Sequence, residues 1–576
     1  TKHRSKMNKI PFSINLVILS VLLFFSCKSK LPEKTEKNIT GEIAEQAMVV
    51  SARKEASKIG VDIMKKGGNA FDAMVATEMA LAVSYPFAGN LGGGGFMVYR
   101  TADGEIGSLD YREKAPLAAS KNMYLDENGE VIEGKSTLGA MASGVPGTIA
   151  GIFKVHEKFG SLPIQELLQP VIELAEKGVV VTQKQQERLQ KYREVLMQVN
   201  QDTILFTRAY KIGDTIKNES LANTLRRIAV NGRSEFYSGE TGQKILEFLQ
   251  MQGGILTEED LLKYEAKWRK PVRISYKNYQ VISMPPPSSG GIVLGEILKM
   301  IEPFSLKDYN QNSTKYIQVL TEAERRAYAD RSFYLGDPDF YEVPQDGLLS
   351  DEYLSKRMTN FSFEQATPSS TIDHGVINGY ESDETTHYSI VDSEGNAVSV
   401  TTTLNGAYGS KLYIPELGFF MNNEMNDFSL KPGIPNMFGL IGAEANAIAP
   451  EKRMLSSMTP TIIEKNGELW MVVGSPGGST IITSVLQTFL NVAEYDLSMQ
   501  EAVSAKRFHH QWLPDEIMME PEGFSEETIK ELQQKGYKIN QKESRIIGKV
   551  DAIKVLPNGN LEGGADPRGD DTAIGF

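Results

Sequence analysis

The sequence has almost no cysteine and no surplus of basic residues, and each deficit excludes a class of protein. Cys27 is the single cysteine among 576 residues, so the chain forms no internal disulfide and no cysteine-based metal site. Lysine and arginine number 61 against 74 aspartate and glutamate residues, which gives a formal net charge of −13. Because nucleic-acid binding needs basic residues that neutralise phosphates, we expect no nucleic-acid partner.

Long apolar runs are also scarce. The run at residues 10–25 is shorter than the roughly 20 residues of a membrane-spanning helix, follows Lys9, and is followed by a serine and Cys27. A basic start, a short apolar core and a small residue before the cut indicate a secretory signal. The cysteine makes the segment similar to a bacterial lipoprotein signal, so we expect export and a lipid anchor on Cys27; an ordinary signal is the alternative. Residues 28–47 are expected to be a flexible tether, and Met7 is a candidate initiator.

Several familiar motifs are missing. Gly-x-Ser-x-Gly, the nucleophile motif of one large hydrolase class, does not occur. The glycine run at residues 89–95 has no Gly-Lys-Ser/Thr directly after it and leads into a strand, so close backbone approach explains it better than phosphate binding. Adjacent residues such as His509 and His510 diverge on a helix or a strand, and we expect them to be structural. We therefore predict neither a metal nor a cofactor.

From Met48 onward the hydrophobic pattern is that of a packed α/β protein. The expected strands are 48–52, 95–100, 387–392, 396–404, 461–465 and 469–474. The expected helices are 56–66, 70–83, 292–301, 314–334 and 479–490, together with most of 140–270. Residues 335–383 are expected to be mostly irregular.

Two threonines, Thr385 and Thr386, open the β-rich part of the chain. β-propensity alone accounts for most such pairs. The whole run Thr385-Thr-His-Tyr-Ser-Ile-Val-Asp-Ser-Glu-Gly-Asn-Ala-Val-Ser-Val-Thr-Thr-Thr-Leu-Asn-Gly-Ala-Tyr-Gly409 nevertheless resembles the signature of the γ-glutamyltranspeptidase family, which belongs to the N-terminal-nucleophile hydrolases. Similar family blocks follow in order at residues 110–116, 422–428, 452–460, 474–479 and 508–514. The resemblance covers nearly everything from Met48 to Phe576.

The resemblance implies a fold and a maturation step. The implied fold is an α/β (α+β) four-layer αββα sandwich, with two stacked sheets between helical layers. Cleavage of the Glu384–Thr385 bond would divide the chain into a large subunit, 48–384, and a small subunit, 385–576, which remain one intertwined heterodimer. A threonine hydroxyl needs a base, and His387 lies about 7 Å along the strand from Thr385. The resemblance instead implies that the α-amine freed at Thr385 is the base.

The remaining roles come from the same resemblance. Thr403 would hold the nucleophile by hydrogen bonding, and the amides of Gly477 and Gly478 would form the oxyanion hole. The residues implied to bind a γ-glutamyl group are Arg112, Ser456 and Ser457 for its α-carboxylate, and Asn405, Glu424 and Asp427 for its α-ammonium. Glutathione and other γ-glutamyl compounds would be donors, and water, amino acids or dipeptides would be acceptors.

Plainer interpretations exist for each feature taken alone. Arg112 could be a surface ion pair, the two serines a turn, and Gly477-Gly478 a strand-to-helix bend. Residues 435–447 resemble the family's lid, which favours small substrates, but Phe438 stands where a tyrosine is often found. One competing function is a β-lactam side-chain acylase, which has little use for paired carboxylates. The other is a non-catalytic surface lipoprotein, which would not need the nucleophile and its partners together.

Overall fold

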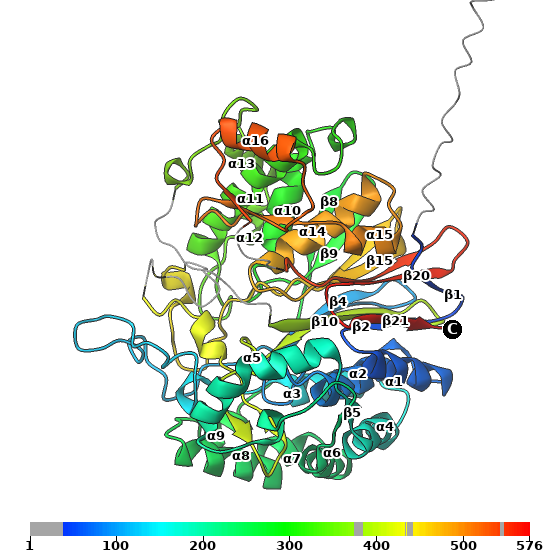
Figure 1. Ribbon diagram of the computed structural model, residues 1–576, viewed down its shortest axis with the longest axis vertical. Helices are drawn as coiled ribbons and strands as arrows, with labels where there is room; N and C mark the ends of the chain where they lie inside the picture. The colour runs from blue at the N-terminus through cyan, green and yellow to red at the C-terminus, as the bar shows by residue number, and fades with distance from the viewer. Residues whose placement is uncertain (1–38, 374–383, 432–433, 435–441, 542–545) are drawn as a thin grey trace, which may run out of the picture. The chain divides into compact units, whose positions relative to one another are not determined.

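Two stacked antiparallel β-sheets form the centre of the folded unit, Ile39–Phe576 (Figure 1). The computed structural model describes residues 39–373, 384–431, 434, 442–541 and 546–576. Sheet 1 consists, in spatial order, of β21 (Thr572–Gly575), β2 (Met48–Ser51), β10 (Thr385–Val391), β11 (Ala397–Thr403), β3 (Gly94–Arg100), β4 (Ile106–Asp110) and β7 (Lys267–Arg269). Sheet 2 consists of β1 (Glu42–Ala44), β20 (Leu561–Ala565), β19 (Asp551–Val555), β15 (Glu468–Gly474), β14 (Thr461–Lys465), β9 (Tyr279–Ser283) and β8 (Val272–Tyr276).

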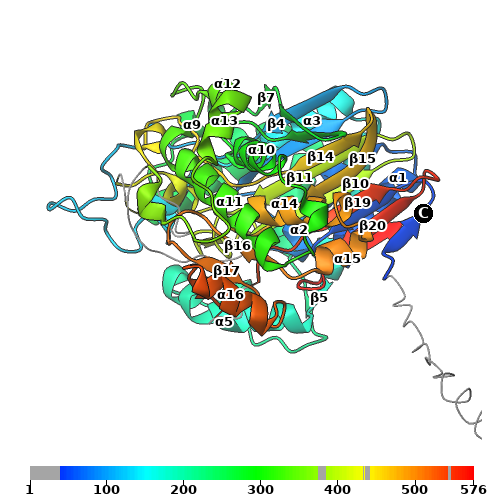
Figure 2. The ribbon, with the colours of Figure 1, turned by 90° about the horizontal axis from the view of Figure 1, so that it is seen from above.

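Helices cover the outer face of each sheet (Figures 1 and 2). On the sheet 1 side lie α1 (Lys54–Lys65), α2 (Ala70–Ser84), α3 (Thr148–Phe159), α4 (Ile164–Lys177), α5 (Gln183–Asn200), α6 (Glu219–Asn231), α7 (Arg233–Tyr237), α8 (Glu240–Met251) and α9 (Glu258–Leu262). On the sheet 2 side lie α10 (Gly290–Ile301), α11 (Thr314–Tyr334), α12 (Gln345–Leu348), α13 (Asp351–Arg357), α14 (Thr480–Ala493), α15 (Met499–Ser504) and α16 (Glu526–Gln534). The short strands form three small sheets: β5 (Val179–Val180) with β6 (Thr215–Ile216), β12 (Tyr413–Ile414) with β13 (Phe419–Phe420), and β16 (Phe508–His509) with β17 (Ile517–Met519) and β18 (Ile539–Asn540).

Three apolar cores separate the four layers, and strand alternation assigns residues to them. In β2, Met48 and Val50 belong to the core between the two sheets, whereas Val49 belongs to the core under the sheet 1 helices. Val473 in β15 packs with the sheet 2 helices, and its neighbour Val472 packs between the sheets. These layers confirm the expected αββα sandwich.

The sequence also predicts several element ends correctly. Asn69 caps α2 in a capping box with Asp72, which explains why that helix begins at Ala70. The segment expected to be mostly irregular contains two short helices, α12 and α13. The tether prediction is wrong from Glu42 onward, because β1 pairs with β20 there and belongs to sheet 2. Residues 1–38, with Cys27 and the signal prediction, lie outside the described residues.

The glycine run is explained by close backbone contacts. A Cβ on Gly92 would lie 2.2 Å from the carbonyl oxygen of Phe420, and one on Gly93 would lie 2.1 Å from that of Thr403. Only glycine permits the turn before β3 to approach β13 and the end of β11 this closely. The close-approach interpretation is therefore confirmed, and the contact fixes the end of the strand that carries Thr403.

Candidate active site

Thr385 is the first residue of β10 and lies opposite Thr403, the last residue of β11. β-branched residues dominate both strands, as is typical of a central pair in a buried sheet. Strand alternation places Thr385, like Ser389, on the face that looks toward sheet 2, where the Ser389 hydroxyl donates to the carbonyl of Asp551 in β19. Thr385 is almost fully buried, and its Oγ1 lies 3.5 Å from the Oγ1 of Thr403. The structure therefore brings the predicted nucleophile and its predicted partner together.

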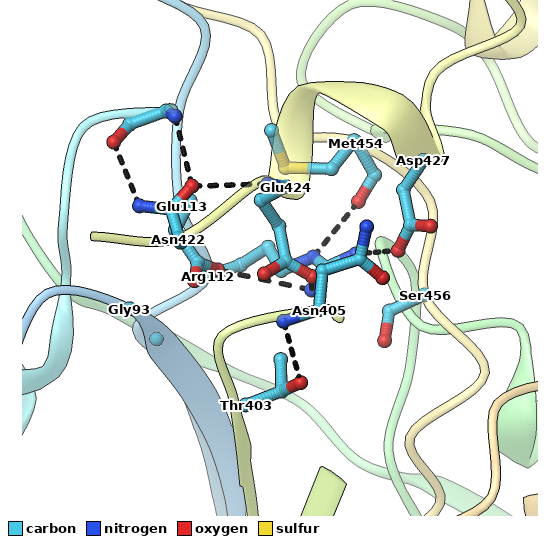
Figure 3. Close-up of polar contacts among 12 residues, drawn as sticks. Gly93, Arg112, Glu113, Thr403, Asn405, Asn422, Glu424, Asp427, Met454 and Ser456 are labelled. Carbon is cyan, nitrogen blue, oxygen red and sulfur yellow. Dashed lines mark hydrogen bonds and ion pairs between the residues drawn. The ribbon is translucent and has the colours of Figure 1, made fainter. Parts of the chain in front are cut away.

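Hydrogen bonds orient the Thr403 hydroxyl. It donates to the main-chain carbonyl oxygen of Glu384 over 3.2 Å, and it accepts from the backbone N–H of Asn405 over 2.8 Å (Figure 3). A hydroxyl has one proton, so Thr403 cannot at the same time donate to Thr385. In the uncut chain, Thr385 is consequently the donor between the two threonines, and Thr403 polarises the carbonyl that precedes Thr385.

His387 takes no part in this arrangement. Its Nδ1 lies 2.9 Å from Thr401 Oγ1 and its Nε2 lies 3.0 Å from Ser389 Oγ, so both ring nitrogens are engaged between the sheets. Burial lowers the pKa of His387 to about 3, which keeps the ring neutral. The expectation that His387 does not contact the nucleophile agrees with these positions.

Arg112 is the centre of the polar pocket beside Thr385 (Figure 3). Its side chain is buried and forms ion pairs with Glu424 and with Asp427, the latter at 2.6 Å, both from the 3₁₀ turn η5 (Glu424–Asp427). It also donates to the carbonyls of Met454 and Leu455, at 3.2 and 3.1 Å. Although burial lowers the pKa of Arg112, the surrounding carboxylates raise it above its ordinary value. Arg112 is thus a pocket residue, and the interpretation as a surface ion pair is wrong.

A third carboxylate, Glu113, completes this cluster and is not among the residues the sequence predicts. Its Oε2 lies 3.7 Å from the Nη1 of Arg112, and its side chain is buried. Burial raises the pKa of Glu113 to about 7 and that of Glu424 well above its ordinary value, and the charge of Arg112 opposes both shifts. Glu113 therefore holds a proton at acidic pH and releases it near neutrality. Its position beside Arg112, within the family block at residues 110–116, could have pointed to Glu113.

The other predicted residues line the same pocket. Ser456 and Ser457 follow the carbonyls that Arg112 binds, and the Oγ of Ser457 accepts from Arg331 of α11 over 3.0 Å. Gly477 and Gly478 form the bend between β15 and α14, with φ of 130° and 55°. Gly478 lines the pocket together with Thr385, which is the placement that an oxyanion hole requires. No sequence pattern pointed to Arg331, because helical spacing does not distinguish an arginine that faces a pocket from any other arginine on the helix.

The pocket is narrow in the uncut chain. Its free space is about 20 Å³, enough for about one water molecule. Of the predicted lid, residues 435–441 with Phe438 lie outside the described residues. The described remainder includes Asn446, which donates to the carbonyl of Asp427 over 2.7 Å and accepts from the N–H of Leu455 over 2.9 Å. This part of the lid is therefore fastened directly to the segments that surround Arg112.

The histidine pair has structural partners. His509 lies 2.8 Å from Thr483 Oγ1 and 2.9 Å from Gln511 Oε1, and His510 accepts from the N–H of Trp512. Within the described residues, no three histidine, cysteine, aspartate or glutamate side chains gather as a possible metal site. Over the same residues, no helix is both long and apolar enough to span a membrane.

An αββα sandwich with a threonine at the start of a central strand, between the two sheets, is the architecture of the N-terminal-nucleophile hydrolases. A crystal structure of a cephalosporin acylase from Bacillus halodurans is similar, with a TM-score of 0.82, 27% identity and coverage of 95% of this chain and 98% of that one. A crystal structure of γ-glutamyltranspeptidase from Helicobacter pylori shows 42% identity and a TM-score of 0.55 over 59% of this chain and 99% of its own.

The sequence comparisons are more specific than the fold. The family model for γ-glutamyltranspeptidase matches residues 56–576. The glutathione hydrolase proenzyme of Escherichia coli strain K12 is 47% identical over 538 residues, which cover 92% of each chain. The protein belongs to the γ-glutamyltranspeptidase family, as the motif resemblance indicated.

Proposed function

We propose that this protein is a precursor that cuts itself before Thr385 and that the freed Thr385 then carries γ-glutamyl groups from donor to acceptor. Because the protein belongs to this family, we assign it the activity of a self-processing γ-glutamyltransferase and glutathione hydrolase. The observation that supports the assignment of Thr385 is its position, within 3.5 Å of the Thr403 hydroxyl that polarises the preceding carbonyl and beside the Arg112 pocket.

Self-cleavage would begin with attack of Thr385 Oγ1 on the carbonyl carbon of Glu384. The hydroxyl of Thr403 donates to the oxygen that becomes negative, and the Thr385 proton ends on the departing nitrogen. The C–N bond breaks as the C–O bond forms, which leaves an ester between Glu384 and Thr385. Water then hydrolyses the ester, releasing the carboxyl group of Glu384 and the free hydroxyl and amine of Thr385.

The new amine supplies the base that the uncut chain lacks. An α-amine has an ordinary pKa of about 8, so a useful fraction is neutral near physiological pH and can accept the Oγ1 proton. Departure of the Glu384 carbonyl also frees the Thr403 proton, which can then turn to the Thr385 hydroxyl and hold the nucleophile. Thr403 would therefore serve both stages with one hydroxyl.

The Arg112 pocket suits the two charged ends of a γ-glutamyl group. The guanidinium can bind the α-carboxylate, with the hydroxyls of Ser456 and Ser457 as further donors. Glu424 and Asp427, with Asn405, can bind the α-ammonium. The γ-carbonyl then lies at Thr385, and the amides of Gly477 and Gly478 would stabilise its oxyanion. An acyl group without an α-ammonium would leave Glu424 and Asp427 without a partner in the substrate, which disfavours β-lactam side chains as substrates.

The donors and acceptors follow from this chemistry. Glutathione and other γ-glutamyl compounds are the proposed donors, and the ester passes to water or to the amine of an amino acid or dipeptide. The predicted large subunit, residues 48–384, is a share of this chain comparable to that spanned by the Helicobacter pylori chain, which supports a processed heterodimer of large and small subunits.

Export and lipidation of Cys27 are part of the proposal and rest on the sequence pattern of residues 1–27 alone. Mass spectrometry of the N-terminal peptide would detect the lipid. Cys27→Ser is expected to move the protein from the membrane fraction to the soluble exported fraction, and an unchanged distribution would contradict the anchor.

N-terminal sequencing and donor turnover test the central assignment. Purified protein is expected to give two fragments, of which the smaller begins Thr385-Thr386-His387. Release of p-nitroaniline from its γ-glutamyl derivative should rise on addition of an acceptor dipeptide, while the glutaryl derivative, which lacks the ammonium, should be a poor substrate. A full-length chain without activity, or equal use of both derivatives, would refute the proposal.

A further inference from the structure

The residue before the predicted cut has a binding site of its own. The Glu384 side chain is almost fully buried, and both of its carboxylate oxygens have donors. Oε1 accepts from the hydroxyl of Tyr192, in α5, over 2.8 Å, and Oε2 accepts from the backbone N–H of Ala407. A buried carboxylate is stable only with such partners, so this side chain is held in place and not merely accommodated.

A buried lysine supplies a charge of opposite sign. Lys411 is 8% exposed, donates to the carbonyl of Gly409 over 3.0 Å, and places its ammonium 5.7 Å from the centre of the Tyr192 ring. Burial lowers the pKa of Lys411, and the charge of Glu384 opposes that shift. The site therefore has two hydrogen-bond donors and a nearby cation, which is a set suited to a carboxylate.

The site gives the scissile bond a point of attachment in addition to the sheet. Thr385 is held by its register with Thr403 in β11, and the Glu384 carbonyl oxygen is held by the Thr403 hydroxyl. Without the side-chain contacts, only the hydrogen bond from Thr403 to the carbonyl oxygen would restrict rotation of the Glu384 backbone. Small errors in the approach of nucleophile to carbonyl lower reaction rates strongly, so a second point of attachment has a direct kinetic use.

We propose that the Glu384 side chain is the recognition element for self-cleavage, and that Tyr192, the Ala407 amide and Lys411 form a positioning site for it. The inference rests on the proposed function, because it concerns the same cleavage before Thr385. It goes beyond that function by assigning a specificity for the residue on the acyl side of the cut, namely a side chain of glutamate length that bears a carboxylate. Tyr192 and Lys411 act through Glu384 and are positioning residues.

The test measures the first-order rate of self-cleavage of freshly prepared full-length chains by gel densitometry. Loss of a hydrogen bond to a charged group corresponds to about a 10- to 100-fold change, so Glu384→Ala should slow cleavage by at least that factor. Glu384→Gln, which keeps one carbonyl oxygen for two donors, should be intermediate. Tyr192→Phe should slow the wild-type chain about tenfold and have no further effect in the Glu384→Ala background.

Matched controls separate positioning from general destabilisation. Tyr210→Phe removes a hydroxyl that donates to the carbonyl of Leu205 in the same helical layer, and it should leave the cleavage rate unchanged. Lys411→Met should slow cleavage of the Glu384 chain but not of the Glu384→Gln chain. Cleavage of Glu384→Ala at the wild-type rate, or additive effects of Tyr192→Phe and Glu384→Ala, would overturn the inference and leave the proposed function intact. Cleavage of a Thr385→Ala chain would instead overturn the proposed function.

Discussion

Because the carboxyl group of Glu113 is buried, we predict that the stability of the fold decreases as the pH rises. The pKa of Glu113 is raised by burial from 4.5 to about 7, so the folded chain retains a proton that the unfolded chain releases between these values. Below about pH 4 the group is protonated in both states and costs nothing. As the pH rises through the folded pKa, the buried charge destabilises the fold by about 3 kcal/mol at most. For a protein of this size that corresponds to a melting-temperature change of about 3 °C.

The substitution Glu113→Gln removes the charge and keeps the shape. It is made in the Thr385→Ala background, so that a single uncut chain unfolds, and melting is followed by calorimetry from about pH 4 to about pH 9. The difference from the parent should be near its minimum at acidic pH and should grow by about 3 °C in favour of the variant through neutrality. The exposed Glu133→Gln is the control and should give no pH-dependent difference. A difference that stays constant, or that shrinks with rising pH, would refute the assignment of a raised pKa.

Three further predictions concern catalysis. Thr403→Val keeps the volume but removes the donor to the Glu384 carbonyl, so self-cleavage seen on gels should slow by about 10- to 100-fold, and cleavage at the parental rate would contradict the role. Arg112→Lys keeps a cation among the carboxylates but loses the planar guanidinium that can bind a carboxylate through two nitrogens. The KM for a γ-glutamyl donor should therefore rise about tenfold or more while self-cleavage still occurs; a change in kcat alone would contradict the binding role. Because burial keeps His387 neutral with a pKa of about 3, kcat/KM should rise with pH through an apparent pKa of about 8, that of the Thr385 amine, and a profile without that limb would contradict the role of the amine.

Local patterns predicted the elements of the fold well because local chemistry determines them. Asn69 and Asp72 form the capping box that begins α2, and alternating residues in β10 and β11 assign one face of each strand to a core. The order of strands within the two sheets, in contrast, depends on contacts between segments that are far apart in the sequence. β10 from the C-terminal third pairs with β2 from the start of the chain, and no short-range pattern encodes such a contact. The four-layer arrangement came from the family resemblance.

The same division applies to the site. The family blocks pointed to residues that we propose bind the substrate, and the structure brings Thr385, Arg112 and Glu424 together from distant segments. Glu113 and Tyr192 were missed because their roles depend on burial and on partners distant in sequence. Tyr192 reaches Glu384 across 192 positions of the chain, from a helix whose amphipathic pattern marks it only as a packing residue.

The uncut chain lacks the base that cleavage supplies, and it also lacks an open substrate pocket, because the charged side chains of the pocket bind one another. Arg112 is bonded to Glu424 and Asp427, and the remaining space is about that of one water molecule, so a γ-glutamyl group cannot enter without rearrangement. We therefore expect free L-glutamate to raise the melting temperature of a processed protein but not that of the uncut Thr385→Ala chain. The matched control is the same variant produced as two chains, one ending at Glu384 and the other beginning with the alanine that replaces Thr385, so that only the peptide bond differs. Stabilisation of the two-chain form alone would make cleavage a gate for binding as well as for chemistry, whereas equal stabilisation of both forms would show that the pocket opens without the cut.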